Sequence, residues 1–220
     1  MRINADFSRR ALVVPRDADW VRSPESGVDR LMLDRIGDEV ARATSIVRYA
    51  AGSSFPRHLH PKGEEFLVLD GVFSDETGDF PAGTYVRNPP GSSHAPYSAN
   101  GCRILVKLRQ FDAADLAPVV VDTTAESGWR ACDGDLERLP LHEFGAEKVG
   151  MLRLAPGARF ELDGGRGGAE MLVVAGAVSC DGRLLGREAW LRLPRNASAS
   201  LSAEEATTIW LKTGHLPADS

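Results

Sequence analysis

EFLVLDGVFS occupies residues 65–74, and a second version of it, EMLVVAGAVS, occupies residues 170–179. Both stretches combine β-branched residues with a short Asp-Gly or Ala-Gly pair, which is the composition of a half-buried strand that ends in a tight turn. The two stretches are separated by 105 positions. A strand and turn written twice indicate that the chain repeats a larger structural unit.

The repeat extends outward from these two stretches in both directions. VRYAAGSSF at residues 47–55 matches LRLAPGARF at residues 152–160. LVKL at residues 105–108 matches WLKT at residues 210–213, again at a separation of 105 positions. A constant separation over so much of the chain predicts two copies of one domain.

Each copy is composed of short runs of β-branched and aromatic residues that are bounded by Gly or Pro. Such runs predict many short strands with tight turns, and long helical periodicity is absent. About 100 residues of short strands per copy are typical of a small barrel or jelly roll. We therefore predict an all-β chain of two tandem barrels, one over residues 1–112 and one over residues 113–220.

The composition narrows the classes of function. The 220 residues carry a formal net charge of −5, which argues against nucleic acid because phosphate binding needs a concentrated basic surface. No apolar run approaches the roughly 20 residues that span a bilayer, and no secretory signal is visible. The three cysteines, Cys102, Cys132 and Cys180, form no CxxC pair. These features predict a cytoplasmic protein with reduced thiols, without membrane or direct nucleic-acid partners.

Two histidines, His58 and His60, stand one residue apart in the stretch RHLHPKGEEF. Side chains two residues apart on a strand point to the same face, so both imidazoles converge on one side. A hairpin through Pro-Lys-Gly brings Glu64 or Glu65 opposite them, and His94 follows a further turn. Three imidazoles and one carboxylate are a typical ligand set for a first-row divalent ion.

The spacing of these residues resembles the two motifs of the cupin family. The first motif, G-x5-HxH-x3,4-E-x6-G, is matched from Gly52 to Gly71, with Glu64 rather than Glu65 at the carboxylate position. The second motif, G-x5-PxG-x2-H-x3-N, is matched up to its last position, where Ser98 replaces the Asn. The resemblance implies two cupin barrels, each a double-stranded β-helix. It also implies a metal site made by His58, His60, Glu64 and His94.

Three further residues are candidates for supporting the metal site or lining its pocket. Glu65 neighbours Glu64 on one strand, so it is expected to point to the opposite face and to pair with a cation or a backbone group. Tyr97 and Ser98 follow His94 and are candidates for the lining of the pocket. The ligand set accepts zinc, iron, manganese or nickel, and the resemblance favours zinc. The sequence leaves the identity of any catalytic residues unknown.

The second copy has lost these ligands. The positions that correspond to the four ligands at the separation of 105 hold Asp163, Gly165, Ala169 and Ala199. One carboxylate alone holds a divalent ion poorly. We therefore predict one metal ion per chain, in the first barrel, and a structural or interface role for the second barrel.

The stretch from His60 to Ser98 also resembles the cupin domain of the ChrR anti-sigma factors. In that family a separate N-terminal zinc domain holds the sigma factor, and the cupin domain binds zinc and takes part in a stress response. This sequence begins with the cupin region and has no HxxxCxxC segment. The resemblance implies a homodimeric metal-binding regulator, related to anti-sigma factors, with a regulatory protein or a small molecule as its partner.

An enzymatic function stays open beside this interpretation. Ferrous iron held by the same four ligands would leave positions for substrate and oxygen, as in cupin dioxygenases. An isomerase or a simple ligand-binding protein would use the same pocket with a less reactive metal. An open, partly apolar pocket beside the metal favours an enzyme, whereas a closed ligand shell favours a regulator.

Overall fold

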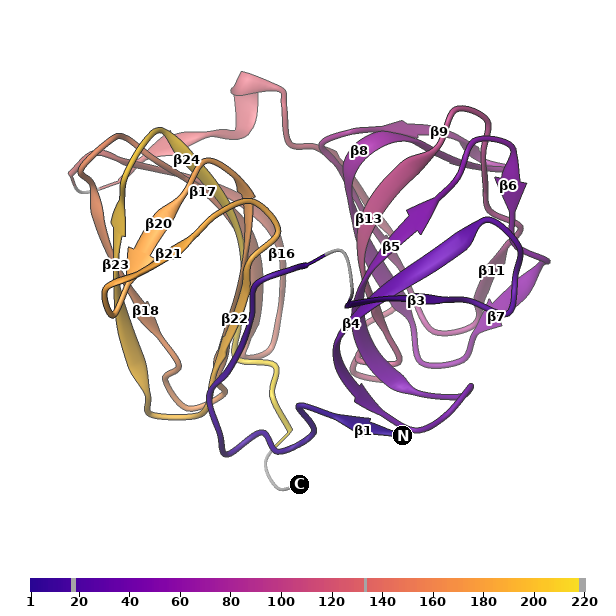
Figure 1. The fold of residues 1–220 in the computed structure, drawn as a ribbon, viewed down its shortest axis with the longest axis horizontal. Coiled ribbons are helices and arrows are strands. Elements are labelled where there is room, and N and C mark those ends of the chain that lie inside the picture. Colours follow the sequence, from indigo (N-terminus) through magenta and orange to yellow (C-terminus); the bar gives the residue numbers. More distant parts are fainter. Residues whose placement is uncertain (17–18, 133, 218–220) are drawn as a thin grey trace. The chain divides into compact units, whose positions relative to one another are not determined.

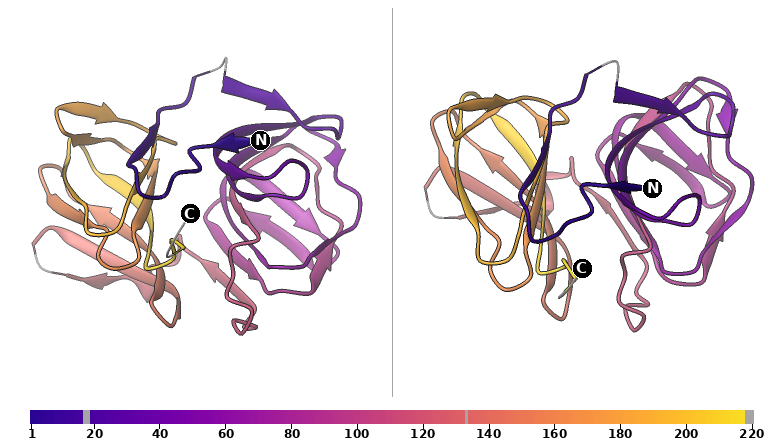
Figure 2. Two further views of the ribbon diagram at one scale, coloured as in Figure 1. Left: turned by 90° about the horizontal axis from the view of Figure 1, so that it is seen from below. Right: turned by 60° about the horizontal axis from the view of Figure 1, so that its bottom comes forward.

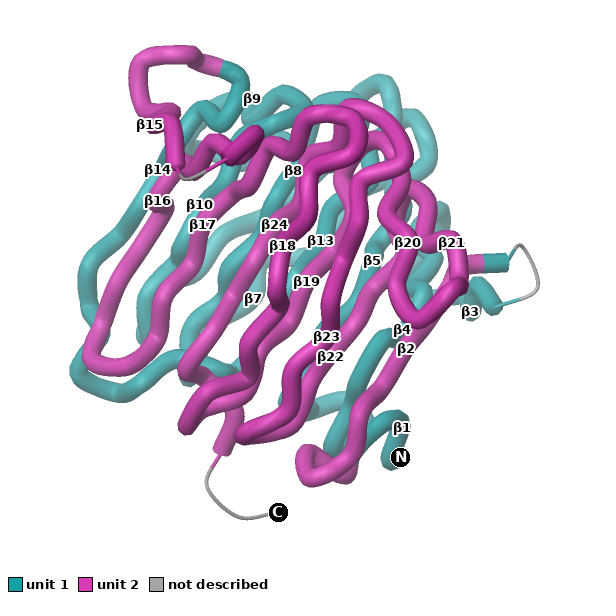
Figure 3. The backbone as a smooth tube through the Cα atoms, turned by 90° about the vertical axis from the view of Figure 1, so that its left-hand side faces the viewer, with its two compact units in different colours: residues 1–5, 16–124 teal, residues 6–15, 125–220 magenta. Residues whose placement is uncertain are grey.

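The structure, a computed structural model, describes residues 1–16, 19–132 and 134–217. The chain forms two compact units, and each is built mainly of β-strands (Figure 1). The first unit comprises Met1–Ala5 and Arg16–Thr124, and the second comprises Asp6–Pro15 and Ala125–Ser220 (Figure 3). The predicted all-β architecture with two barrels is confirmed. No helix in the described ranges is long and apolar enough to cross a membrane.

The first unit contains a large sheet with its main strands in the order β1-β4-β5-β13-β8-β10-β14, and a two-stranded sheet of β7 and β11. Views from two further directions show how its strands curl into a barrel (Figure 2). The strands are β1 (Arg2–Ile3), β3 (Trp20–Arg22), β4 (Val28–Ile36), β5 (Arg42–Tyr49), β6 (Ser53–Ser54), β7 (His58–His60), β8 (Glu64–Asp75), β9 (Gly78–Pro81), β10 (Thr84–Asn88), β11 (Ser92–His94), β12 (Tyr97–Ser98), β13 (Cys102–Leu108) and β14 (Val119–Asp122).

The second unit contains a seven-stranded sheet in the order β15-β16-β17-β24-β19-β22-β2 and a four-stranded sheet in the order β18-β23-β20-β21. Its elements are β2 (Ala11–Val13), the 3-10 turn η2 (Glu126–Gly128), β15 (Arg130–Ala131), β16 (Leu136–Phe144), β17 (Glu147–Leu154), β18 (Arg159–Asp163), β19 (Ala169–Ala175), β20 (Val178–Cys180), β21 (Arg183–Leu185), β22 (Trp190–Leu193), β23 (Ser198–Ala203) and β24 (Thr207–Thr213).

The Asp-Gly pair that the repeat marks lies in β8, which takes part in both layers of the first barrel. The first half of β8 pairs with β10 and β13, and its second half pairs with β9. Between the halves, Gly71 has φ +71°, and a Cβ there would lie 2.1 Å from the carbonyl oxygen of Gly101. Gly176 is its counterpart, with φ +76° and a Cβ position 2.4 Å from the Ala206 carbonyl oxygen. Glycine is required at both positions because the backbones approach closely.

The two units share one strand order but complete it from different parts of the sequence. The order β3-β4-β5-β13-β8-β10-β14 in the first unit corresponds to β15-β16-β17-β24-β19-β22-β2 in the second. The outermost strand β14 pairs Val120 with Val86, and the outermost strand β2 pairs Leu12 with Leu191. The N-terminal segment therefore covers an edge of the second barrel that would otherwise expose unpaired backbone groups.

Candidate metal centre

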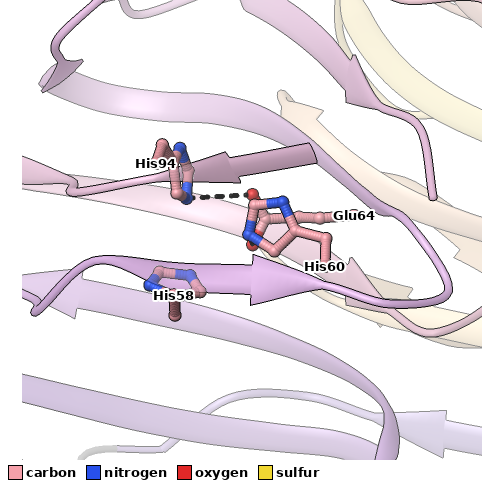
Figure 4. A group of neighbouring side chains, drawn as sticks. All are labelled: His58, His60, Glu64 and His94. Carbon is pink, nitrogen blue, oxygen red and sulfur yellow. Dashed lines mark ion pairs between the residues drawn. The ribbon is translucent and has the colours of Figure 1, made fainter. Parts of the chain in front are cut away.

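Four donor side chains meet inside the first barrel (Figure 4). His58 and His60 come from β7, Glu64 begins β8, and His94 ends β11. One ligand atom of each residue lies within 4.8 Å of those of the other three. His94 Nε2 is 3.4 Å from one Glu64 carboxylate oxygen, and His60 Nε2 is 3.6 Å from the other. The structure thus brings together all four residues that the spacing selects.

Strand pairing explains the closeness of the three imidazoles. β7 and β11 are antiparallel, and His58 stands opposite His94 in their register. The three ring centroids lie 4.7 to 4.9 Å from one another. His60 shares the inward face of β7 with His58 because side chains alternate along a strand. Glu64 then approaches from the neighbouring sheet, directly after the Pro-Lys-Gly turn.

A β-bulge precedes the histidine pair. The Phe55 N–H donates to the Pro96 carbonyl oxygen over 2.8 Å. The next pair in the ladder is His58 with His94. Between these two contacts, residues 56 and 57 of one strand therefore face residue 95 alone. An inserted residue of this kind changes the direction of the side chains that follow, and bulges are common beside functional sites.

Fixed hydrogen-bond partners hold His58 and His60 at their Nδ1 atoms. The Nδ1 of His58 lies 2.9 Å from the Pro56 carbonyl oxygen, and that of His60 lies 3.1 Å from the Ser92 hydroxyl. A carbonyl only accepts, so the Nδ1 of His58 carries the hydrogen and its Nε2 keeps a free lone pair. The Nε2 of His60 is buried and has no hydrogen-bond partner in the described ranges. A metal ion would satisfy this nitrogen, and the residues present therefore fit such an ion.

The third imidazole is held by a carboxylate. His94 Nδ1 lies 3.0 Å from Asp75 Oδ2. Asp75 Oδ1 accepts hydrogen bonds from the backbone N–H and the hydroxyl of Thr77, at 2.7 and 2.6 Å, which fixes the carboxylate. Such a partner keeps the hydrogen on Nδ1 and turns Nε2 toward the other donors. Sequence reasoning missed Asp75, because it lies outside both motifs; its replacement by Cys180 in the second copy is the signal that could have found it.

Two of the three imidazoles, those of His60 and His94, are kept neutral by their surroundings. Burial lowers the pKa of His60 to about 3, and the neighbouring His94 and His58 rings add to the effect. Burial also lowers the pKa of His94, although its hydrogen bond to Asp75 opposes this change. A neutral imidazole offers the lone pair that a metal ion needs.

The carboxylate has the opposite shift. Burial raises the pKa of Glu64 to about 7, where the Asn88 amide opposes the change and the Asp75 charge adds to it. The Asn88 side chain donates to Glu64 Oε1 over 3.3 Å. A buried cation would favour the ionised form of Glu64, because opposite charges within a few ångströms stabilise each other strongly.

Comparison with known proteins identifies the family. The model of the ChrR cupin-like domain matches the chain twice, over residues 8–112 and 117–217. The chain belongs to the ChrR cupin-like family. No curated protein matches the cupin chain by sequence.

Solved structures show the same cupin fold. Protein YlbA from Escherichia coli superposes with a TM-score of 0.69 at 15% identity, covering 94% of this chain and 91% of that chain. The bacterial pirin YhhW from Escherichia coli, in complex with nickel(II), gives 0.68 at 14% identity, with coverages of 94% and 99%. Salicylate 1,2-dioxygenase from Pseudoaminobacter salicylatoxidans gives 0.56 at 12% identity, with coverages of 77% and 67%. At these identities the similarity shows the fold alone.

The three further candidates, Glu65, Tyr97 and Ser98, differ in their surroundings. Glu65 accepts hydrogen bonds from the Tyr85 hydroxyl at 2.6 Å and from the Arg87 guanidinium at 2.8 Å, and all three side chains are buried. Tyr97 is 43% exposed on β12. Ser98 is buried, but its hydroxyl donates to the Val72 carbonyl oxygen over 2.6 Å. Glu65 and Ser98 therefore support the strands that carry the centre.

The second cupin barrel has an apolar interior where the first has donors. Ala169 and Ala199 lie in its hydrophobic core, and Leu162 pairs with Ala199. Leu162 thereby takes the place of the first histidine, which corrects the sequence alignment with Asp163: the second barrel lacks the bulge, so its register differs by one residue. Asp163 is exposed and accepts a hydrogen bond from the Gly165 N–H at 2.8 Å. Within the described part of this unit alone, no three donor side chains lie close enough to share an ion.

Proposed function

We propose that this bicupin binds one divalent metal ion in the first barrel, through His58, His60, Glu64 and His94, and that the second barrel binds none. The observation that carries the proposal is the convergence of three imidazoles and a buried carboxylate, with the buried His60 Nε2 left without a hydrogen bond. Zinc is the ion we favour, since three nitrogens and one oxygen suit its tetrahedral shell. When bound, the ion would supply a fixed positive charge and Lewis acidity at this point.

We propose further that the metal centre serves a regulatory protein of the ChrR-like kind, in a stress response or in the control of transcription. Membership of the ChrR cupin-like family supports this role. Three of the four donors are buried and only His58 is half-buried, so a small-molecule effector would approach on the His58 side. We also propose that the protein forms a homodimer and binds a regulatory protein partner.

A metal-dependent dioxygenase is the second candidate function. The half-buried His58 is the observation that favours it, because this side of the centre is within reach of a small molecule. The Phe55 ring packs edge-on against His58 with centroids 5.4 Å apart, which gives this side an apolar wall. Sites of enzymes combine such apolar walls with a few polar groups.

Elemental analysis of untagged protein, purified without chelators, tests the metal proposal. We expect close to one equivalent of metal in the wild type, its loss in His58→Ala, and no change in the matched control Asp163→Ala. Metal-free wild type, or a second equivalent lost in Asp163→Ala, would contradict the proposal.

The identity of the metal and oxygen uptake separate the two functions. A regulator is expected to retain zinc and, after loading with ferrous iron, to consume no oxygen with small organic acids. Oxygen uptake by the iron-loaded protein that disappears in His58→Ala would favour the dioxygenase instead.

A further inference from the structure

A positively charged side chain lies on the interior face of the first barrel, apart from the four donors. Arg30 of β4 pairs with Val47 of β5, and Val47 pairs in turn with Ile104 of β13. Ile104 pairs with Val68 of β8, which shares a face with Glu64 because the two residues are four apart. Paired residues of neighbouring strands point to the same side, so Arg30 stands on the face that carries the metal centre.

The charge of Arg30 has no counter-ion in the described part of the chain. Arg30 is half-buried, and its guanidinium lies 6.0 Å from the centroid of the Phe55 ring. Phe55 is the residue that packs against His58, at a centroid distance of 5.4 Å. On the opposite face of the same strand pair, Arg48 binds Asp29 at 2.8 Å. Only one aromatic ring therefore separates an unpaired guanidinium from a proposed metal ligand.

A second guanidinium strengthens the positive character of this face. Arg35 pairs with Ala43 on the same side of the sheet as Arg30. It is buried, and it donates to the carbonyl oxygens of Gly37 and Asp38 rather than to a carboxylate. Burial lowers the pKa of Arg35 and the charge of Arg30 lowers it further, whereas the Glu39 and Asp38 carboxylates oppose the change. A partly buried charge without a counter-ion, such as that of Arg30 among the described residues, costs free energy, which an anionic ligand would recover.

We propose that Arg30 binds the anionic group of a small carboxylate ligand that packs on Phe55 and reaches the metal centre. This inference rests on the proposed function, since the ligand would be the effector or substrate of that centre. A guanidinium matches a carboxylate with two parallel hydrogen bonds, which gives selectivity for the anion. The edge-on packing of Phe55 against His58 leads from this anion site to the donors.

Calorimetric titration with benzoate and with its uncharged analogue benzamide tests the inference. We expect the zinc-loaded wild type to bind benzoate at least about tenfold more tightly than benzamide. In Arg30→Gln this preference should fall to within about twofold, and Arg30→Lys should restore part of it. Arg48→Gln, which removes an equal charge from the outer face, should leave the preference unchanged. Equal binding of the two probes by the wild type, or a preference kept in Arg30→Gln, would overturn the anion site.

The same titration on chelator-treated protein separates this inference from the metal proposal. Arg30 contacts the ligand directly, so metal-free protein should keep a preference for benzoate that Arg30→Gln removes. If the wild type binds no zinc but still prefers benzoate, and Arg30→Gln removes this preference, the anion site is upheld and the metal centre is refuted. If the wild type binds one equivalent of zinc but shows no preference for benzoate over benzamide, the metal centre is upheld and the anion site is refuted.

Discussion

The two barrels share a strand order and the glycines at their close backbone contacts, yet their interiors differ in kind. The first barrel directs three imidazoles and a carboxylate inward, whereas the second fills the corresponding positions with apolar side chains such as Leu162, Ala169 and Ala199. The partners of the donors have changed as well: Asp75 corresponds to Cys180. The fold therefore does not require the donors.

The opposite face of the same strands kept its buried polar contacts in both copies. Glu65 accepts from the Tyr85 hydroxyl at 2.6 Å, and its counterpart Glu170 accepts from the Trp190 indole N–H at 2.7 Å. All four side chains are buried. Buried polar groups must keep their partners together, because losing one leaves the other unsatisfied. The two copies therefore differ in their interiors, where apolar side chains replace the whole donor set, and agree in the buried polar pair on the opposite face.

The substitution Ala169→Glu tests the difference between the two interiors and should have the largest effect on stability. It places a carboxylate at the position that corresponds to Glu64. We expect it to lower the free energy of unfolding of the second barrel by about 3 kcal/mol or more, because the charge would lie among apolar side chains. Glu64→Ala should cost the metal-free protein only about 1 kcal/mol, because it removes little more than the hydrogen bond from the Asn88 amide. Urea unfolding measures both changes: tryptophan fluorescence follows the second barrel, where Trp190 and Trp210 are buried, and circular dichroism follows the first.

The control for this pair is Ala169→Met, which adds volume without charge. Overpacking alone should cost less than the glutamate. A loss of stability in Ala169→Glu no larger than that in Ala169→Met would show that the second interior tolerates a donor, and that the difference between the barrels is not one of polarity.

The next comparison concerns the outermost strands. Leu12 of β2 packs against the core of the second barrel, whereas its counterpart Val120 of β14 is 64% exposed. We expect Leu12→Asp to lower the free energy of unfolding by about 2 kcal/mol, and Val120→Asp to change it by less than about 0.5 kcal/mol. Hydrogen exchange should then be faster at the amides of β22 in Leu12→Asp. Equal effects of the two substitutions would mean that β2 does not complete the second barrel.

A smaller effect is expected at the partner of His94. Asp75→Asn removes the charge that holds the imidazole, and zinc affinity should fall by about tenfold to a hundredfold while the fold is retained. The matched change in the second barrel, Cys180→Ser, should leave zinc affinity unaltered. Competition titration with a chromogenic chelator measures both, and circular dichroism checks the fold. An unchanged affinity in Asp75→Asn would show that the hydrogen bond does not tune the donor.

The effect of each pH unit on metal binding is at the lower end of the range expected for Asp75→Asn. The pKa of Glu64 is raised to about 7, so below that pH a metal ion must displace a proton from the carboxyl group. The pKa of His60 is lowered to about 3, so this imidazole offers no competing proton in the same range. Zinc affinity should therefore fall by about tenfold per unit as the pH decreases from 7 to 5. A profile equally steep in Glu64→Gln would assign the proton to another group.

Much of the centre follows from local spacing. His58 and His60 share a face because strand side chains alternate, and the separation from Glu64 to Gly71 distinguishes it from Glu65. Asp75 could not be selected in this way, since its contact with His94 spans 19 positions and depends on how β8 bends between layers. The strand register around His58 could not be predicted from the sequence either. The bulge before His58 shifts the pairing by one residue relative to the second barrel, although the separation of 105 positions is the same on both sides of it.

The sequence by itself determined the repeat, the all-β class and the four donors, because these follow from periodicity and from fixed separations along the chain. Only the tertiary structure decided which strands close each barrel and what surrounds each donor. Residues 11–13 pair with β22, and Leu12 and its partner Leu191 are separated by 179 positions along the chain. Arg30 of β4 and Phe55, which follows β6, lie near each other beside His58 although they are 25 positions apart. Such contacts arise from packing among distant segments, which no local pattern encodes.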